Sequence, residues 1–145
     1  MSNFELSMKF EVKPEIMFQN IIDFEYYPNF MKQIKDVKII KKEGNEVVTE
    51  ETLMFKTLFK KEIIQQTTHR IEKNKIYSVI NSGIAKGSIV DIVLEECEKD
   101  VNVIVKIELK LELRGKIFEP LIKRYMKMYV IGLLRKINTK IWEKN

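Results

Sequence analysis

The spacing of apolar residues changes once along this chain, and that change constrains the fold more than any other feature. From residue 34 to about residue 113, runs of alternating apolar and polar residues are separated by short turns, as in strands with one buried face. From Lys116 to Glu143, apolar residues recur every three or four positions, the period of an α-helix. Connections between the expected strands are too short for parallel crossovers, so the strands should form an antiparallel meander.

The N-terminal residues predict one strand followed by two short helices. Apolar and polar side chains alternate from Phe4 to Val12, which favours a strand with one wet face. A helix is expected over about Pro14 to Ile22, because proline fits the first helical turn, where its missing N–H costs nothing. Residues 24–31 are rich in aromatic side chains, and Pro28 disfavours a continuous helix there. We therefore expect a bend leading into a second short helix.

The middle of the chain predicts about six strands, which with the first makes about seven. Their expected bounds are Ile34 to Glu43, Glu46 to about Phe59, Lys61 to Glu72, Lys75 to Asn81, Ser88 to Glu96 and Val101 to Leu113. A Gly44-Asn45 turn indicates a hairpin between the first two of these strands. The last strand is long for its kind, which suggests that it is curved.

These elements predict an α+β fold in one domain, residues 1–145, whose curved antiparallel sheet wraps around a long C-terminal helix. A curved sheet buries its concave face only if another element fills it, and the terminal helix is the only expected element with enough apolar surface. A helix is only about 10 Å wide, so side chains need not fill the whole space. Apolar spaces of roughly several hundred Å³ are typical of small-molecule sites. The sequence therefore predicts a cavity.

Methionines, aromatic residues and inward strand positions are the expected lining of this cavity, because thioethers and rings can fit guests of different shapes. The stripe on the terminal helix is expected to contain Phe118, Leu121, Ile122, Tyr125, Met128, Tyr129 and Leu133. The residues predicted to contact a ligand are Tyr27, Phe30, Met31, Met54, Gln65, Thr67, His69, Val90, Ile92, Val103, Val105, Phe118, Leu121, Tyr125, Met128 and Tyr129. For each of them, the alternative is that it simply fills core volume.

The order of the elements and two short segments carry a resemblance to a known family. The segments are Asp23-Phe24-Glu25-Tyr26-Tyr27-Pro28-Asn29-Phe30-Met31 and Val37-Lys38-Ile39-Ile40. In these features the chain resembles the START-like (SRPBCC) superfamily. The chain is most similar to its polyketide cyclase and coenzyme Q-binding branch, whose second short helix carries a tyrosine-proline pair and an aromatic residue, matched here by Tyr27, Pro28 and Phe30. The resemblance covers nearly the whole chain in element order. It implies a helix-grip fold with a hydrophobic tunnel that binds lipids, quinones, polyketides or hormones, in many members without catalysis.

One departure from the branch concerns ligand identity. Later strands in that branch often carry a tryptophan, whereas the matching strand here, Ser88 to Leu94, has none, and the only tryptophan is Trp142. The resemblance therefore implies the class of guest without its identity.

The sequence offers few residues for catalysis. His69 is the only histidine, and no Gly-x-Ser-x-Gly motif is present. Gln65, Thr67 and His69 share one strand face, which either enters the cavity as a polar stripe or lies on the wet convex side. In the first case His69, a weak catalytic candidate, could orient a ligand or act as an acid or base. Acidic residues are expected to point outward from the strands, and we predict no metal and no cofactor.

All of the positive net charge lies in the terminal helix. Residues 1–115 carry 18 Lys plus Arg against 19 Asp plus Glu, whereas residues 116–145 carry 8 against 2. This basic face is either solvated or a contact for an anionic membrane or RNA.

The sequence favours a cytoplasmic protein. Cys97 is the only cysteine, no apolar stretch approaches the roughly 20 residues of a transmembrane span, and the N-terminus shows no secretory signal. The leading hypothesis is a carrier, chaperone or sensor for a hydrophobic small molecule. A cyclase or dehydratase, and an interaction protein that uses its basic helix, are the alternatives.

Overall fold

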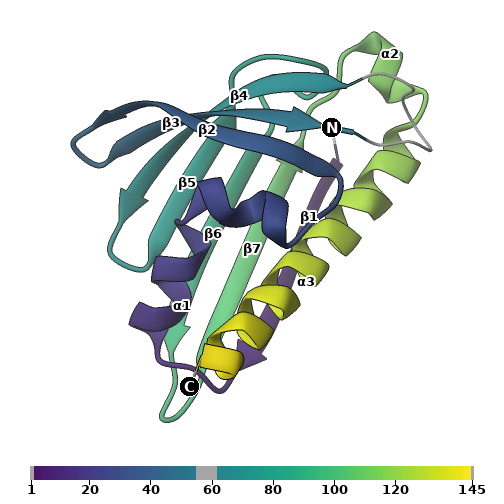
Figure 1. Cartoon of the computed structure of the whole chain (residues 1–145). Coiled ribbons are helices and arrows are strands. Elements are labelled where there is room, and N and C mark those ends of the chain that lie inside the picture. Colours follow the sequence, from purple (N-terminus) through teal and green to yellow (C-terminus); the bar gives the residue numbers. More distant parts are fainter. Residues whose placement is uncertain (1, 55–61, 145) are drawn as a thin grey trace.

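The computed structural model describes residues 2–54 and 62–144, in which a curved sheet partly encloses a long helix (Figure 1). The strands are β1 (Ser2–Phe10), β2 (Ile34–Glu43), β3 (Glu46–Leu53), β4 (Ile63–Glu72), β5 (Lys75–Ile80), β6 (Ile89–Glu96) and β7 (Val101–Leu109). Their order in the sheet is β1-β7-β6-β5-β4-β3-β2, and all neighbours are antiparallel. The predicted meander is therefore confirmed from β2 to β7, and β1 joins the far edge beside β7. The end of the strand predicted to reach about Phe59 lies outside the described residues.

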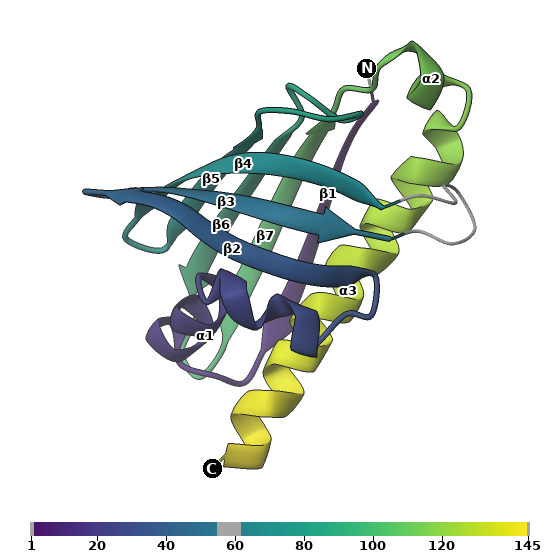
Figure 2. The same cartoon turned by 45° about the horizontal axis from the view of Figure 1, so that its top comes forward.

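Two short helices follow β1, as predicted, and two helices follow β7. They are α1 (Pro14–Ile21), the 3-10 helix η1 (Phe24–Asn29), α2 (Leu113–Lys116) and α3 (Glu119–Lys144). Figures 1 and 2 show α3 running along the concave side of the sheet, with α1 and η1 beside its C-terminal half. Within the described part of the chain, no helix is both long and apolar enough to cross a membrane.

The last strand is shorter than predicted, ending at Leu109 instead of Leu113. The strand ends early because the Ser88 hydroxyl takes over the pairing of Lys110: the Lys110 N–H donates to Ser88 Oγ (2.8 Å), and Ser88 Oγ donates to the Lys110 carbonyl (2.9 Å). The Glu112 N–H then donates to the carbonyl of Ile84, in the loop before β6. The backbone thus leaves the strand ladder and turns into α2.

One terminal helix was predicted from Lys116 to Glu143, but the structure has two helices separated by a short break. Helix α2 ends at Lys116 and α3 begins at Glu119. Pro120 explains the new start, since proline has no N–H for a helical bond to a preceding carbonyl and is tolerated only in the first turn.

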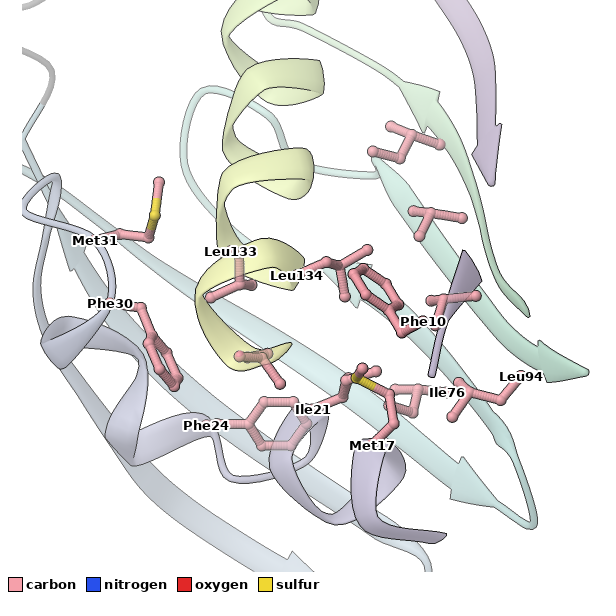
Figure 3. Close-up of a cluster of buried hydrophobic side chains, with 14 of the residues drawn as sticks. Phe10, Met17, Ile21, Phe24, Phe30, Met31, Ile76, Leu94, Leu133 and Leu134 are labelled. Carbon is pink, nitrogen blue, oxygen red and sulfur yellow. The ribbon is translucent and has the colours of Figure 1, made fainter. Parts of the chain in front are cut away.

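Packing of the C-terminal half of α3 fixes how this helix is rotated. Leu134 and Ile137 are 3% and 0% exposed, and they belong to the same buried cluster as Met17 and Ile21 of α1 (Figure 3). Met128 lies nine residues before Ile137, which is two and a half helical turns and therefore the opposite face. The two halves of the helix cannot be rotated independently, so the buried half determines what the other half presents.

This rotation corrects the predicted helical stripe. Phe118, Leu121 and Met128 are 42%, 41% and 59% exposed, whereas they were expected to face the sheet. Four residues of the predicted stripe, Ile122, Tyr125, Tyr129 and Leu133, do face the sheet, and Met126 and Val130 join them in place of the three exposed residues. The apolar residues of the N-terminal half would allow either of two helix rotations. The contacts of the C-terminal half determine which of the two is adopted.

Substitutions to alanine on the two faces of α3 test this rotation. We expect Ile137→Ala to lower the free energy of unfolding by about 2 to 5 kcal/mol, because it opens a cavity in a fully buried site. Met128→Ala, on the exposed face, should change it by less than about 0.5 kcal/mol. Urea denaturation of both variants measures the difference. Equal losses would contradict the assigned face.

Candidate functional site

A cavity of about 240 Å³ lies between the concave face of the sheet and α3, which lines it from Ile122 to Ile137. Its walls are the inward positions of β2 to β7, the facing side of α3, Phe24 and Tyr27 of η1, and residues of α1 and of the loop before β6. Most of the lining is aliphatic or aromatic. The cavity exists because the curved sheet is wider than the single helix that covers it, and the lining side chains do not meet across the gap.

Many of the residues predicted to contact a ligand do line this cavity. They are Tyr27 of η1, Gln65, Thr67 and His69 of β4, Val90 and Ile92 of β6, Val105 of β7, and Tyr125 and Tyr129 of α3. The polar stripe of β4 therefore faces inward, which settles the choice that the sequence left open. These residues meet because strand neighbours two positions apart share a face.

The other predicted residues lie elsewhere. Phe30, Met31 and Val103 are buried in the core without lining the cavity, and Met54 is not among the described lining residues. Met31 packs toward the backbone of α3, where its Cε lies 3.7 Å from the position that a Cβ on Gly132 would take. Phe118, Leu121 and Met128 fall outside the cavity because of the rotation of α3 described above.

Polar side chains from three neighbouring strands form one connected row, the polar belt, made of Ser78, His69, Thr49 and Glu51. The Oγ atom of Ser78 lies 2.7 Å from Nδ1 of His69, and Nε2 of the same ring lies 2.8 Å from Oγ1 of Thr49. Thr49 Oγ1 donates in turn to Oε1 of Glu51 at 3.2 Å. Strand register explains the row, because Thr49 on β3 lies diagonal to His69 on β4, and His69 is paired directly with Ser78 on β5.

Counting hydrogens assigns the direction of every bond in the polar belt. Thr49 has one hydroxyl hydrogen, which goes to Glu51, so Thr49 must accept from Nε2 of His69. His69 then carries its hydrogen on Nε2, and its Nδ1 accepts from the Ser78 hydroxyl. The belt is therefore a directed chain of donors that ends at the Glu51 carboxylate.

His69 is a fixed member of this chain. Burial lowers the pKa of His69 to about 4, so the imidazole is neutral around pH 7. Its ring also stacks on Phe24, with centroids 4.0 Å apart and an interplanar angle of 17°. Both nitrogens are engaged and the ring is held on one face, which suits a residue that orients Thr49.

Glu51 is the functional candidate that sequence reasoning missed, and its inward position corrects the expectation that acidic residues point outward. Burial raises the pKa of Glu51 to about 7, against the lowering effect of the Thr67 and Thr49 hydroxyls beside it. A signal was present in the sequence, because Val47 and Leu53 share its parity on β3 and both are apolar. Period two alone therefore places Glu51 on the inner face.

Two polar atoms at this point of the lining have no hydrogen-bond partner. They are Oε2 of Glu51 and Oγ1 of Thr67, both buried: the Thr67 hydroxyl is near enough to lower the pKa of Glu51, but neither atom has a hydrogen bond of good geometry to any residue that the structure describes. Tyr129, across the cavity on α3, has its pKa raised by burial and by the nearby Glu51 charge, and Tyr27 has its pKa raised mainly by burial. Both phenols therefore stay protonated at neutral pH and can act only as neutral hydrogen-bonding groups.

The family model described as polyketide cyclase / dehydrase and lipid transport matches residues 10–130 of this sequence. The chain belongs to this family. Its resemblance to the START-like superfamily is thereby confirmed for the polyketide cyclase branch, while coenzyme Q binding stays a prediction. A search of curated proteins finds no match.

Solved structures with the same helix-grip fold include three that cover nearly the whole chain. A protein of Thermus thermophilus has 13% identity and a TM-score of 0.84, with 99% of each chain covered. The Zhui aromatase/cyclase of a Streptomyces species has 7% identity and a TM-score of 0.77, covering 97% of this chain and 95% of that one. A START superfamily protein of Mycobacterium smegmatis has 12% identity and a TM-score of 0.77, covering 94% and 97%. At such low sequence identity, these structural similarities show a shared fold and nothing more specific.

The raised pKa of Glu51 makes stability depend on pH. The folded chain binds this proton more tightly than the unfolded chain, with a pKa of about 7 against 4.5, so stability falls as pH rises between these values. We expect Glu51→Gln to match the wild type near pH 4.5 and to be more stable by about 2 to 3 kcal/mol near pH 8. Urea denaturation at both pH values measures this difference.

His69 acts in the opposite direction and serves as the internal check. Its folded pKa of about 4 lies below the ordinary 6.5, so its contribution to stability is present above 6.5 and lost as pH falls toward 4. The two effects largely offset each other in the wild type, whereas Glu51→Gln should show the His69 slope alone. A difference between variant and wild type that does not change with pH would contradict the raised pKa of Glu51.

Proposed function

We propose that this protein is a non-catalytic cytosolic carrier, chaperone or sensor that encloses a hydrophobic small molecule between its sheet and α3. The observation that carries the proposal is the largely apolar cavity of about 240 Å³ beneath α3. Burying apolar surface contributes roughly 25 cal/mol per Å², so such a guest gains affinity without a charged anchor. Membership in a family whose description includes lipid transport supports the same interpretation.

The size of the cavity favours a compact guest. Pockets for drug-sized ligands typically measure roughly 300 to 1,000 Å³, and this one lies just below that range. A fused-ring molecule or a quinone head group fits such a space, whereas a long isoprenoid chain would extend beyond it.

The alternative is a cyclase or dehydratase, and one observation favours it. Glu51 has a pKa of about 7 on the cavity wall, which suits a general acid or base near neutral pH better than the neutral, doubly bonded His69 does. Mass spectrometry of a guest recovered after incubation separates the two functions. A carrier returns the molecule unchanged, and an enzyme returns a product whose formation is lost in Glu51→Gln.

Filling the cavity should abolish binding. Met126 lines the cavity on α3 and Met128, two residues later, is exposed, so the same substitution at both sites is a matched pair. We expect Met126→Trp to weaken binding of the neutral fluorescent probe N-phenyl-1-naphthylamine at least tenfold, because the indole occupies the space of the guest. Met128→Trp should bind as the wild type does. Equal binding by both variants, or none by the wild type, would refute the proposed site.

A second proposal concerns the surface: we propose that the start of α3 contacts anionic membranes. Ile117, Leu121 and Met128 are 79%, 41% and 59% exposed, which places apolar side chains in water on one side of the helix. Arg124 shares this side because it lies three residues after Leu121 and four before Met128. Apolar side chains beside basic ones suit a membrane interface better than RNA, which needs no exposed aliphatic groups.

The distribution of lysine contacts supports this second proposal. Lys136 donates to the carbonyl of Phe30, and Lys140 lies 3.6 Å from the centre of the Tyr26 ring, so both serve packing against η1. Lys123 and Lys127 are nearer in sequence to the exposed apolar residues; they lie 6.0 and 5.3 Å from the centre of the Phe4 ring, and Lys127 is exposed.

Vesicle binding tests the membrane contact. We expect the protein to sediment with vesicles of phosphatidylcholine and phosphatidylserine, and not with phosphatidylcholine alone, because the attraction is electrostatic as well as hydrophobic. The double substitution Leu121→Ser, Met128→Ser should abolish sedimentation. Ile64→Ser, at a 58% exposed site on β4, is the control and should leave it unchanged. Salt-sensitive binding to RNA that survives the double substitution would instead assign the basic face to nucleic acid.

A further inference from the structure

We propose that the cavity selects a compact apolar molecule that carries a hydroxyl group, and that this hydroxyl is held between Oε2 of Glu51 and Oγ1 of Thr67. The inference rests on the proposed ligand-binding function and adds to it the chemical class of the guest. It depends on where these two atoms lie and on which partners the fold leaves for them.

The two atoms lie close together on the same wall. Thr67 pairs with Thr49 across β3 and β4, and Gln65 pairs with Glu51, so Glu51 and Thr67 are diagonal neighbours on the inner face. Both residues line the cavity. A single small group in the cavity can therefore reach both of them.

The polar belt leaves Oε2 of Glu51 as its free end. Oε1 is occupied by the Thr49 hydroxyl, which is itself set by His69 and Ser78. This support fixes the carboxyl group, while Oε2 and Thr67 Oγ1 are themselves covered by neighbouring atoms, so a guest reaches them when lining side chains shift. Buried polar atoms are nearly always hydrogen-bonded, and these two adjacent exceptions among the described residues point to a partner in the cavity.

The donor and acceptor capacity of this pair identifies the partner as a hydroxyl. The carboxylate oxygen only accepts, while the Thr67 hydroxyl has a hydrogen to donate. A guest hydroxyl donates to Oε2 and accepts from Oγ1, which satisfies both. With Glu51 ionised, a carbonyl has nothing to donate to the carboxylate, an ammonium cannot accept the Thr67 hydrogen, and an anion is repelled.

The surroundings of Glu51 make this bond sensitive to pH. Among the described residues, the titratable groups that face it are Tyr129 on α3, with Tyr27 of η1 beside Tyr129, and His69 on β4, which is neutral; Glu50 lies on the other face of the same strand. Above about pH 7 the carboxylate makes a charge-assisted bond, which is roughly twice as strong as a neutral one.

Two probes of equal shape test the inference: 2-naphthol and 2-methylnaphthalene, in which a hydroxyl replaces a methyl group. We expect the wild type to bind 2-naphthol about tenfold more tightly at about pH 8, because the methyl group displaces solvent from Glu51 and Thr67 without replacing its hydrogen bonds. At about pH 5.5, where Glu51 is protonated, the preference should fall to about threefold. Isothermal titration calorimetry gives both ratios on the unmodified chain.

Substitutions then assign the preference to its two residues. Thr67→Val and Glu51→Met should each bring the ratio of the two affinities to within about twofold of one, while 2-methylnaphthalene still binds. Glu50→Met, the same change on the opposite face of β3, is the matched control and should keep the wild-type ratio. Because each ratio compares two probes on one folded protein, a loss of stability in a variant does not imitate the result.

The outcomes separate this inference from the function on which it rests. Equal binding of both probes by the wild type, or a preference kept by Thr67→Val and Glu51→Met, overturns the hydroxyl assignment and leaves the apolar site intact. Tighter binding of 2-naphthylmethylamine than of 2-naphthol would assign the pair to a cation instead. Failure of both naphthalene probes to bind would refute the cavity as a binding site.

Discussion

The packing of the C-terminal half of α3 against α1 and the sheet controls the rest of this structure. Ile137 is fully buried there, with Leu134 beside it, and an α-helix cannot rotate one half without the other. The N-terminal half therefore presents Ile122 and Met126 to the sheet whether or not they fill the space beneath them. A cavity follows because the helix, once these contacts set its phase, does not fill the width of the sheet, and Leu134 and Ile137 themselves form one end of the lining.

The inner face of the sheet is built for two different tasks along its width. Beneath the packed end, β7 offers aliphatic residues such as Val101 and Val103, both 0% exposed, which need only shape. Beneath the cavity, β3 and β4 offer hydroxyls, an imidazole and a carboxyl, which are costly to bury unless they are bonded. The polar belt supplies those bonds for all of its atoms except one. Polar groups on the inner face thus lie beside the cavity, where a guest can supply a missing hydrogen bond, and not in the densely packed core.

The sequence predicts the elements well because alternation along strands and the helical period are local signals. Where prediction failed, the deciding contacts were distant in sequence. The phase of α3 depends on contacts near Ile137, and the early end of β7 depends on the Ser88 hydroxyl. His69 was placed on the same face as Thr67, but which face was inward could not be read from β4 alone, since Ile63 and Ile71 fit both choices. The inward position of Glu51 was predictable, because Glu51 and Val47 lie an even number of residues apart on one strand and so share a face. It was missed because a charged residue was assumed to point outward.

The same features that lower stability are those that suit a guest. An apolar space of about 240 Å³ forfeits packing contacts, and a carboxyl whose pKa is raised to about 7 is held in a fold that resists its ionisation. Neither feature improves the core, and replacing Glu51 and Thr67 with apolar residues of similar size would remove the unpaired polar atoms. A molecule that fills the space and bonds to Oε2 of Glu51 offsets both costs at once, so its binding energy is added to the folding energy of the chain. Unfilled apolar space and a buried, incompletely bonded carboxyl are features that lower stability, and such features are expected to occur together at functional sites. Here they occur together at the free end of the polar belt.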